Sequence, residues 1–311
     1  MSLGIGHCKS VFESKYRFGF TGENVDKVLA IDSVDDVSFR SSSQMVNVGD
    51  VFAPYPFRKS KCNFLPSTNG AACGETLEFA IENALSEALE RSSIMKFWYL
   101  GDRDCYFRMD DQRFDIAAHP AFVYLKELGY QVYLTCCLSG PPVTVLVFCI
   151  HPTENYPFSF CSAGTKKSMR ESIDSALCES VQTLVALSNI SSRVVDWIRK
   201  GLPLSGLDSH MYYYSVKSQS EDAAGSFLTE LRTLDDFNLG HLDEGGEKSL
   251  IGVFSDAIAA TAVDLTPDFL SNELAVCKVH SEHLLPLFVG EKLLPAEIAG
   301  DNRMPYPHPF P

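Results

Sequence analysis

The sequence predicts a mixed α/β fold, in which helices and β-strands form packed layers. One observation is that short apolar runs typical of strands precede long stretches with helical periodicity. A second is a hairpin pattern, in which Tyr130–Leu138 and Val143–Ile150 are separated by Ser139-Gly140-Pro141-Pro142. A third is that no linker-like segment interrupts the 311 residues, so we expect a single domain over residues 1–311.

The main helix-forming stretch, Gly74 to Trp98, has one polar and one apolar side. At about 100° per residue, Asn83, Glu87 and Glu90 fall on one stripe, with Arg91 at its edge. The apolar side consists of Leu77, Ile81, Ala84, Leu85 and Ala88. Such a helix can bury one face while it holds two carboxylates side by side on the other.

A second helix-forming stretch, Gly164 to Leu187, repeats this design with Ser175, Glu179 and Gln182 at the same spacing. Its apolar side consists of Ile173, Ala176, Leu177, Val181 and Leu184. Small residues precede both stretches, at 69–74 and 162–164, and we expect them to form turns whose N–H groups face an anion.

The repetition of the stripe bears on its function. A single Glu-x-x-Glu pattern on an amphipathic helix usually marks a solvated face. Recurrence at the same helical phase instead favours one shared site. Because Mg²⁺ takes a few carboxylates together with substrate phosphates, we expect Glu87, Glu90 and Glu179 to be metal ligands.

Composition and charge exclude several classes of protein. The formal net charge of -14, with 40 acidic and 26 basic residues, argues against nonspecific nucleic-acid binding. No apolar run reaches the roughly 18 residues of a membrane span, and no signal peptide opens the chain. The ten cysteines are scattered without a C-x-x-C pair, so we expect reduced thiols in a cytoplasmic protein. Cys73 and Cys178 lie beside the main motifs, and we expect them to pack as small residues rather than to act as nucleophiles.

The remaining elements are predicted from shorter patterns. Further expected strands are Val28–Asp32, Met45–Phe52, Phe158–Cys161, Met211–Val216 and Leu274–His280. Further expected helices are Pro120–Leu128, Val194–Lys200 and Ala223–Leu234, and residues 101–115 and 235–248 are expected to be loops.

These motifs in this order resemble the YcaO family. The run Thr68–Gly74, then Asn83-x3-Glu87-x-x-Glu90-Arg91 and Trp98, is similar to that family's nucleotide- and magnesium-binding helices, as is Ser175-x3-Glu179-x-x-Gln182. The ending Pro307-His308-Pro309-Phe310-Pro311 matches the PxPxP ending of the azoline-forming branch. The resemblance covers about residue 50 onward. It implies a YcaO-like fold with a divergent or shortened part at 1–50 and a proline-rich tail at 304–311.

The resemblance implies ATP-dependent heterocyclisation of a ribosomally made peptide during bacteriocin-type maturation. A Cys, Ser or Thr side chain adds to the preceding amide carbonyl, the oxyanion is phosphorylated, and phosphate leaves to give a thiazoline or oxazoline. ATP and Mg²⁺ are the implied cofactors, bound by Asn83, Glu87, Glu90, Arg91, Ser175, Glu179 and Gln182.

The implied catalytic segment is the tail, with Pro307, Pro309 and Pro311. Alternating prolines stiffen such a segment, and the α-carboxylate of Pro311 could then act as a positioned base. Because a proline-rich end rarely packs in a core, we expect its removal to leave folding nearly intact.

The sequence also departs from the family pattern. An earlier ATP-binding helix is expected, but in the nearest candidate, Lys9 to Arg17, only Glu13 and Arg17 fit. Ser92 stands where an acidic residue is usual, and Asn83 replaces the commoner Ser or Gln.

Two alternatives therefore stay open. One is a degenerate, non-catalytic relative that binds the peptide or a partner enzyme. The other is a thioamide-forming enzyme, against which PxPxP argues. Expected partners are the precursor peptide, an E1-like or leader-peptide-binding protein, a flavin dehydrogenase of the same pathway and a second copy of the chain, but neither nucleic acid nor membrane.

Overall fold

The computed structural model confirms a mixture of helices with antiparallel sheets. It describes residues 27–35, 38–47, 68–100, 106–112, 114–137, 142–153, 156–200, 207–216, 232–233, 260–270, 273–281, 283–287 and 308–310. The chain forms two compact units, Met1–Arg91 with Glu247–Pro286 and Ser92–Gly246 with Leu287–Pro311. Each unit is described by itself, and a single domain over the whole chain stays a prediction.

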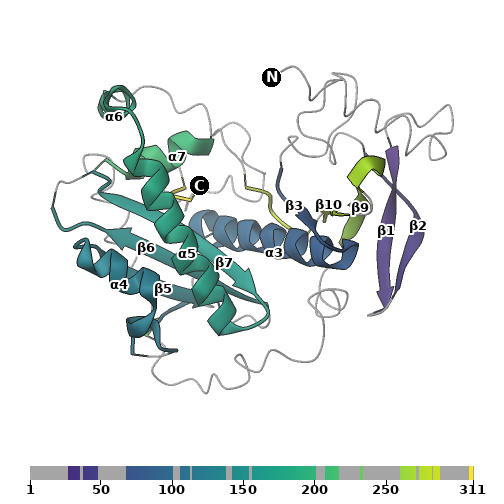
Figure 1. Cartoon of the computed structure of the whole chain (residues 1–311), viewed down its shortest axis with the longest axis horizontal. Helices are drawn as coiled ribbons and strands as arrows, with labels where there is room; N and C mark the ends of the chain where they lie inside the picture. Colours follow the sequence, from purple (N-terminus) through teal and green to yellow (C-terminus); the bar gives the residue numbers. More distant parts are fainter. Residues whose placement is uncertain are drawn as a thin grey trace. The chain divides into compact units, whose positions relative to one another are not determined.

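The first unit contains a five-stranded sheet in the order β2-β1-β9-β10-β3, and all its neighbouring strands are antiparallel. Its strands are β1 (Lys27–Asp35), β2 (Ser38–Asn47), β3 (Ala71–Gly74), β9 (Thr261–Asp264) and β10 (Ala275–His280). Helix α3 (Leu77–Met95) follows β3 directly (Figure 1). The core joins Ala80, Ile81, Ala84 and Leu85 of α3 to Ala262, Ala275, Cys277 and Val279. The apolar side predicted for this helix is therefore the side that packs on the sheet.

The second unit contains a sheet in the order β7-β6-β5-β4-β8, in which only the β4–β8 pair is parallel. Its strands are β4 (Tyr106–Arg108), β5 (Gln131–Cys137), β6 (Val143–Ile150), β7 (Ser159–Lys166) and β8 (Arg232–Thr233). Helices α4 (Pro120–Glu127) and α5 (Met169–Ser188) lie over one face of this sheet (Figure 1). Their buried residues share one core cluster with β5, β6 and β7. Seven consecutive residues of β6 are buried, as expected for a strand covered on both faces.

The helices of the second unit begin at recognisable sequence signals. Ser168 and Glu171 form a complete capping box at the start of α5. The first residue of α4 is a proline, and the His119 side chain accepts a hydrogen bond from Ala121 N as its N-cap. The shorter elements are the π-helical turn η1 (Lys96–Leu100), the 3-10 helices η2 (Ile116–Ala118) and η3 (Asp268–Leu270), and the helices α6 (Ser192–Arg199) and α7 (Leu207–Tyr214). None of the described helices is long and apolar enough to cross a membrane.

Most predicted elements are confirmed, but three are wrong. Met211–Val216 was expected to be a strand, and the structure instead has helix α7 there. The expected loop at 101–115 contains β4. The expected small-residue turns are largely strand, β3 and β7, which lead into the two polar helices. The predicted helix Ala223–Leu234 lies outside the described residues except for β8, and the candidate helix Lys9 to Arg17 lies wholly outside them.

The helix at Met211–Tyr214, where a strand was predicted, is explained by contacts with a distant part of the chain. Aromatic residues such as Tyr212 favour strands, but tertiary contacts decide here. Phe158 N donates to Ser215 O at 2.7 Å, and Ser159 Oγ donates to Tyr214 O at 2.6 Å. These bonds satisfy carbonyls at the C-terminal end of α7, which a helix cannot satisfy by itself.

Candidate functional site

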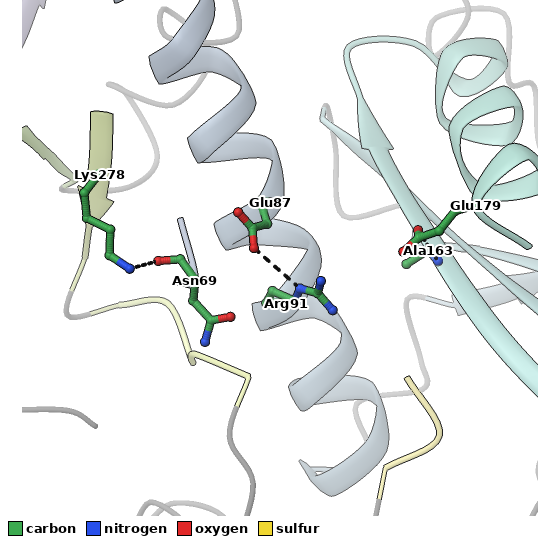
Figure 2. A network of polar contacts seen from close by, with 6 residues as sticks. All are labelled: Asn69, Glu87, Arg91, Ala163, Glu179 and Lys278. Carbon is green, nitrogen blue, oxygen red and sulfur yellow. Dashed lines mark hydrogen bonds and ion pairs between the residues drawn. The ribbon is translucent and has the colours of Figure 1, made fainter. Parts of the chain in front are cut away.

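Helix α3 carries the first polar stripe within the first unit. Asn83, Glu87 and Glu90 are all partly buried, so each is sheltered yet reachable from solvent. Arg91 Nε lies 3.9 Å from Glu87 Oε1, and the two side chains are 17% and 29% exposed (Figure 2). Arg91 thus stands beside a carboxylate of the stripe, at the predicted edge. At this distance and exposure the pair contributes little to stability, about 1 kcal/mol at most.

The turn before β3 packs against α3. Gly70 has a φ of +70°, and an added Cβ would lie 2.7 Å from Val279 O and 3.5 Å from the Ala88 Cβ. Glycine is needed here both for the left-handed conformation and for the close approach to β10. The Asn69–Gly70 turn therefore packs against Ala88 on the apolar side of α3, one residue along the chain from Glu87.

A buried lysine reaches the same turn. Lys278 of β10 is 4% exposed, and its Nζ donates a hydrogen bond to Asn69 O (Figure 2). A buried ammonium requires such compensation, because its desolvation is costly. Sequence reasoning missed this residue. The signal that could have found it is a lysine inside the otherwise apolar run of residues 275–279.

Helix α5 carries the second stripe within the second unit. Ser175 and Glu179 are partly buried, and Gln182 is exposed. Ala163 N, on β7, donates to Glu179 Oε2 at 3.3 Å (Figure 2). Among the described strands, β7 is the edge strand of its sheet, so no further described strand accepts a hydrogen bond from Ala163 N. The Glu179 carboxylate accepts it instead. This contact fixes the side chain relative to the sheet.

The small residues before the two helices have a different role from the one predicted. An added Cβ at Gly164 would lie 2.5 Å from Ser172 O and 2.7 Å from Ala176 N. At Gly74 it would lie 2.9 Å from Ala80 N. Glycine therefore lets each strand approach the helix that follows it. The expectation of a turn is therefore wrong for residues 162–164 and holds only at Asn69–Gly70 of the first segment. At Ala163 the N–H meets the protein's own carboxylate, that of Glu179.

The donor set suits a hard divalent cation. Carboxylate oxygens are the ligands that Mg²⁺ prefers, and Glu87, Glu90 and Glu179 are partly buried on well-packed helices. The first two belong to the first unit and Glu179 to the second. It therefore stays a prediction that the two stripes meet in one cavity. It also stays a prediction that nucleotide is bound by Asn83, Glu87, Glu90, Arg91, Ser175, Glu179 and Gln182.

The tail is part of a core, contrary to expectation. His308 and Phe310 are fully buried, and Pro309 is buried too, whereas Pro307 and Pro311 lie outside the described residues. The Phe310 ring contacts Phe148 of β6 with centroids 5.8 Å apart. Pro309 lines a small apolar cavity together with Trp98, Phe148, Cys149, Ile150, Ser159, Phe160, Cys161 and Tyr214. The expectation that deletion of the tail costs few core contacts is wrong, because the aromatic residue between the prolines anchors the segment.

The described cysteines are free thiols of two kinds. Cys136 and Cys277 are buried, and burial raises the pKa of each thiol to about 12, so they behave as small hydrophobes. Cys73 and Cys178 are exposed. The expectation that these two pack as small residues is therefore wrong.

Comparison with known proteins agrees with this architecture. The profile of the YcaO cyclodehydratase family, described as ATP- and Mg²⁺-binding, matches residues 11–284. None of the curated proteins matches the sequence.

Solved structures share the fold. The heterocyclase TruD has a TM-score of 0.53 and 19% identity over 84% of this chain. The E. coli microcin synthetase McbBCD complex with pro-MccB17 bound contains a chain with a TM-score of 0.58 and 15% identity over 88% of this chain. YcaO from Methanopyrus kandleri, bound with AMPPCP and Mg²⁺, has a TM-score of 0.51 and 18% identity over 82%.

The fraction of each related chain that this chain covers differs from one structure to the next. This chain spans 34% of the TruD chain, 70% of the McbBCD chain and 63% of the Methanopyrus kandleri chain. At these identities the likeness shows the fold alone, and it confirms the YcaO-like fold expected from the motifs.

Proposed function

Because the chain belongs to the YcaO cyclodehydratase family, we propose that it is an ATP-dependent peptide cyclodehydratase component. Its substrate would be a Cys, Ser or Thr of a ribosomally made precursor peptide, and its product a thiazoline or oxazoline. The observation that carries the proposal is the family match over residues 11–284, which includes both carboxylate-bearing helices. The natural setting would be maturation of a bacteriocin-type peptide in the cytoplasm.

The proposed nucleotide site uses the two polar stripes. Glu87, Glu90 and Glu179 would hold Mg²⁺, which offsets the charge of the phosphates. Asn83, Ser175 and Gln182 would supply neutral hydrogen bonds, and Arg91 a charge for a phosphate oxygen. Bound ATP supplies the phosphoryl group that turns the amide oxygen into a leaving group. The described geometry supports this role through partial burial of the carboxylates on helices that are fixed by their cores.

The proposed catalytic segment is the tail. The buried His308 and Phe310 hold it within the second unit. A group held in this way costs less entropy to place than one on a mobile end. We propose that the α-carboxylate of Pro311 accepts the proton of the attacking side chain, as the resemblance to the azoline-forming branch implies.

The test is cyclisation of a precursor peptide by the purified full chain, alone and with an E1-like partner protein. The readouts are loss of one water mass per ring by mass spectrometry and phosphate release from ATP. The proposal expects both, in stoichiometric proportion and dependent on Mg²⁺. The pro-MccB17 peptide bound in the McbBCD complex suggests a precursor peptide as the class of substrate to try first.

The same assay separates the alternatives. Peptide binding without phosphate release would identify a non-catalytic relative, and it would overturn the enzymatic role. Gain of sulfur in place of loss of water, given a sulfide donor, would identify thioamide formation. If a panel of precursor peptides and partners gives no peptide binding, no cyclisation and no thioamide formation, the assignment to peptide modification would be overturned.

A further inference from the structure

Three side chains with different donor atoms meet on the surface of the second unit. They are His119, Asp174 and Cys178, and their ligand atoms all lie within 4.8 Å of one another. His119 Nε2 lies 2.9 Å from Asp174 Oδ1. Asp174 and Cys178 are four residues apart on α5, so both project toward the same side of the helix.

The three residues are held by a rigid support. His119 is the N-cap of α4, and Phe122 and Leu125 of that helix share a core cluster with Ile173 and Leu177 of α5. The two helices therefore cannot slide without disturbing the core. The site is thus preorganised by packing, and only side-chain rotations are needed to bring three donors onto one ion.

The donors match one class of metal. Imidazole nitrogen, carboxylate oxygen and thiolate sulfur are the three ligand types that Zn²⁺ takes from proteins. Bonds of about 2.0–2.3 Å in a tetrahedral site place ligand atoms about 3.3–3.6 Å apart. The His119–Asp174 pair, at 2.9 Å, must therefore open slightly, and the Cys178 sulfur lies within 4.8 Å of both partner atoms. A hard ion such as Mg²⁺ would gain little from the thiol or the imidazole.

We propose that His119, Asp174 and Cys178 form a binding site for one zinc-like divalent cation, with a fourth position open to water. The ion would link the N-terminus of α4 to the middle of α5. This site is separate from the proposed Mg²⁺–nucleotide site, which uses other residues.

Binding of the ion would move one proton within the His119 imidazole and release one proton from the Cys178 thiol. Ala121 N donates to His119 Nδ1 at 3.2 Å, so in the metal-free protein Nδ1 is an acceptor and Nε2 donates its proton to Asp174. When a metal takes Nε2, the imidazole proton moves to Nδ1, and the Ala121 bond is lost. Cys178 gives up its thiol proton to solvent. Binding thus releases about one proton per ion.

The experiment uses the full chain, freed of metal by a chelator, with a non-thiol reductant and excess Mg²⁺ to fill oxygen-only sites. Co²⁺ is titrated as the probe, because a cobalt–thiolate bond absorbs in the near ultraviolet and bound Zn²⁺ abolishes that band. We expect the intensity of this band to saturate at one Co²⁺ per chain, and we expect Zn²⁺ to displace the Co²⁺ and abolish the band. Calorimetry in two buffers of different ionisation enthalpy should show release of about one proton.

Two variants test the ligands without removing a helix cap. Cys178→Ser should abolish the cobalt–thiolate band and weaken Zn²⁺ binding at least about tenfold. His119→Asn should weaken it similarly, yet asparagine is a favoured N-cap residue and can still accept from Ala121 N. Cys73→Ser, at the other exposed cysteine among the described residues, should bind as the parent does. Glu179→Gln should also retain the band, so loss of the nucleotide site and loss of this site are distinguishable.

Other results overturn the proposal. If the parent shows no thiolate band, or if Cys178→Ser retains it, the cation site does not exist. If His119→Asn binds Zn²⁺ as tightly as the parent, imidazole is not a ligand. In each case the His119–Asp174 bond is only a hydrogen-bonded link between two helices.

Discussion

His210 Nδ1 lies 3.1 Å from His308 Nε2, a contact between residues that are 98 positions apart in the sequence. Both rings are fully buried, and their centroids are 4.4 Å apart. The His308 ring also lies nearly perpendicular to the Tyr99 ring, with centroids 6.3 Å apart. Helix α7 therefore holds the proline-rich tail in the second unit through an imidazole pair.

The first prediction concerns the anchor of the tail. Phe310→Ala should destabilise the second unit by about 3–5 kcal/mol, the usual cost of truncating a fully buried Phe. Urea unfolding followed by fluorescence measures it. The control is Tyr124→Ala, an aromatic on α4 that is 45% exposed, which should change stability by about 0.5 kcal/mol at most. Equal stability of Phe310→Ala and the parent would show that the tail does not belong to the core.

The second prediction concerns pH. Burial lowers the pKa of His210 from its ordinary 6.5 to about 4. Between these values the unfolded chain binds a proton at His210 that the folded chain does not, so stability falls as the pH drops from 6.5 to 4. The slope from this one group reaches at most about 1.4 kcal/mol per pH unit.

His210→Asn removes this titration, so its stability should depend less steeply on pH across the same window than that of the parent. Urea midpoints at a series of pH values measure the difference. Parallel curves for the two proteins would mean that His210 titrates normally in the folded state.

The third prediction concerns the proposed magnesium ligands. Glu87→Gln and Glu179→Gln should each weaken Mg²⁺–ATP binding at least about tenfold, since a ligand charge is lost. Stability should change by about 1 kcal/mol at most, because the Glu87–Arg91 pair is weak and a glutamine oxygen can still accept from Ala163 N. Calorimetric titration beside thermal melts separates the two effects.

Glu127→Gln, at an exposed position of α4, is the matched control and should bind as the parent does. Undiminished binding by both test variants would remove Glu87 and Glu179 from the nucleotide site.

The fourth prediction concerns the proposed catalytic carboxylate. Because Phe310 is a core residue, deletion of the tail would confuse loss of folding with loss of chemistry. Adding one residue after Pro311 keeps every buried contact and moves the carboxylate by up to about 3.5 Å. A misplacement of about 1 Å can cost about 100-fold in rate, so cyclisation should fall sharply while nucleotide binding and melting temperature persist. A parent-like cyclisation rate in the extended protein would reject the carboxylate's role.

Features encoded by local periodicity could be predicted from the sequence. The helical stripe of Glu87 and Glu90, its counterpart at Glu179 and the strand Val143–Ile150 depend on residues at fixed short spacings. In such elements the spacing of the apolar residues places them on one face, and that face is then buried. The order of the motifs also pointed to the YcaO family, whose profile matches residues 11–284.

Other features were decided only by the tertiary structure. Gly164 looked like a turn residue, but what matters is the Ser172 carbonyl that packs against it. Phe310 was expected to lie in a tail with few core contacts, but its ring packs on Phe148. The pairing of His119 with Asp174 spans 55 positions and has no local pattern. In each case the deciding contact joins residues that only the folded chain brings together, and its free energy outweighs the local preference that a sequence pattern reports.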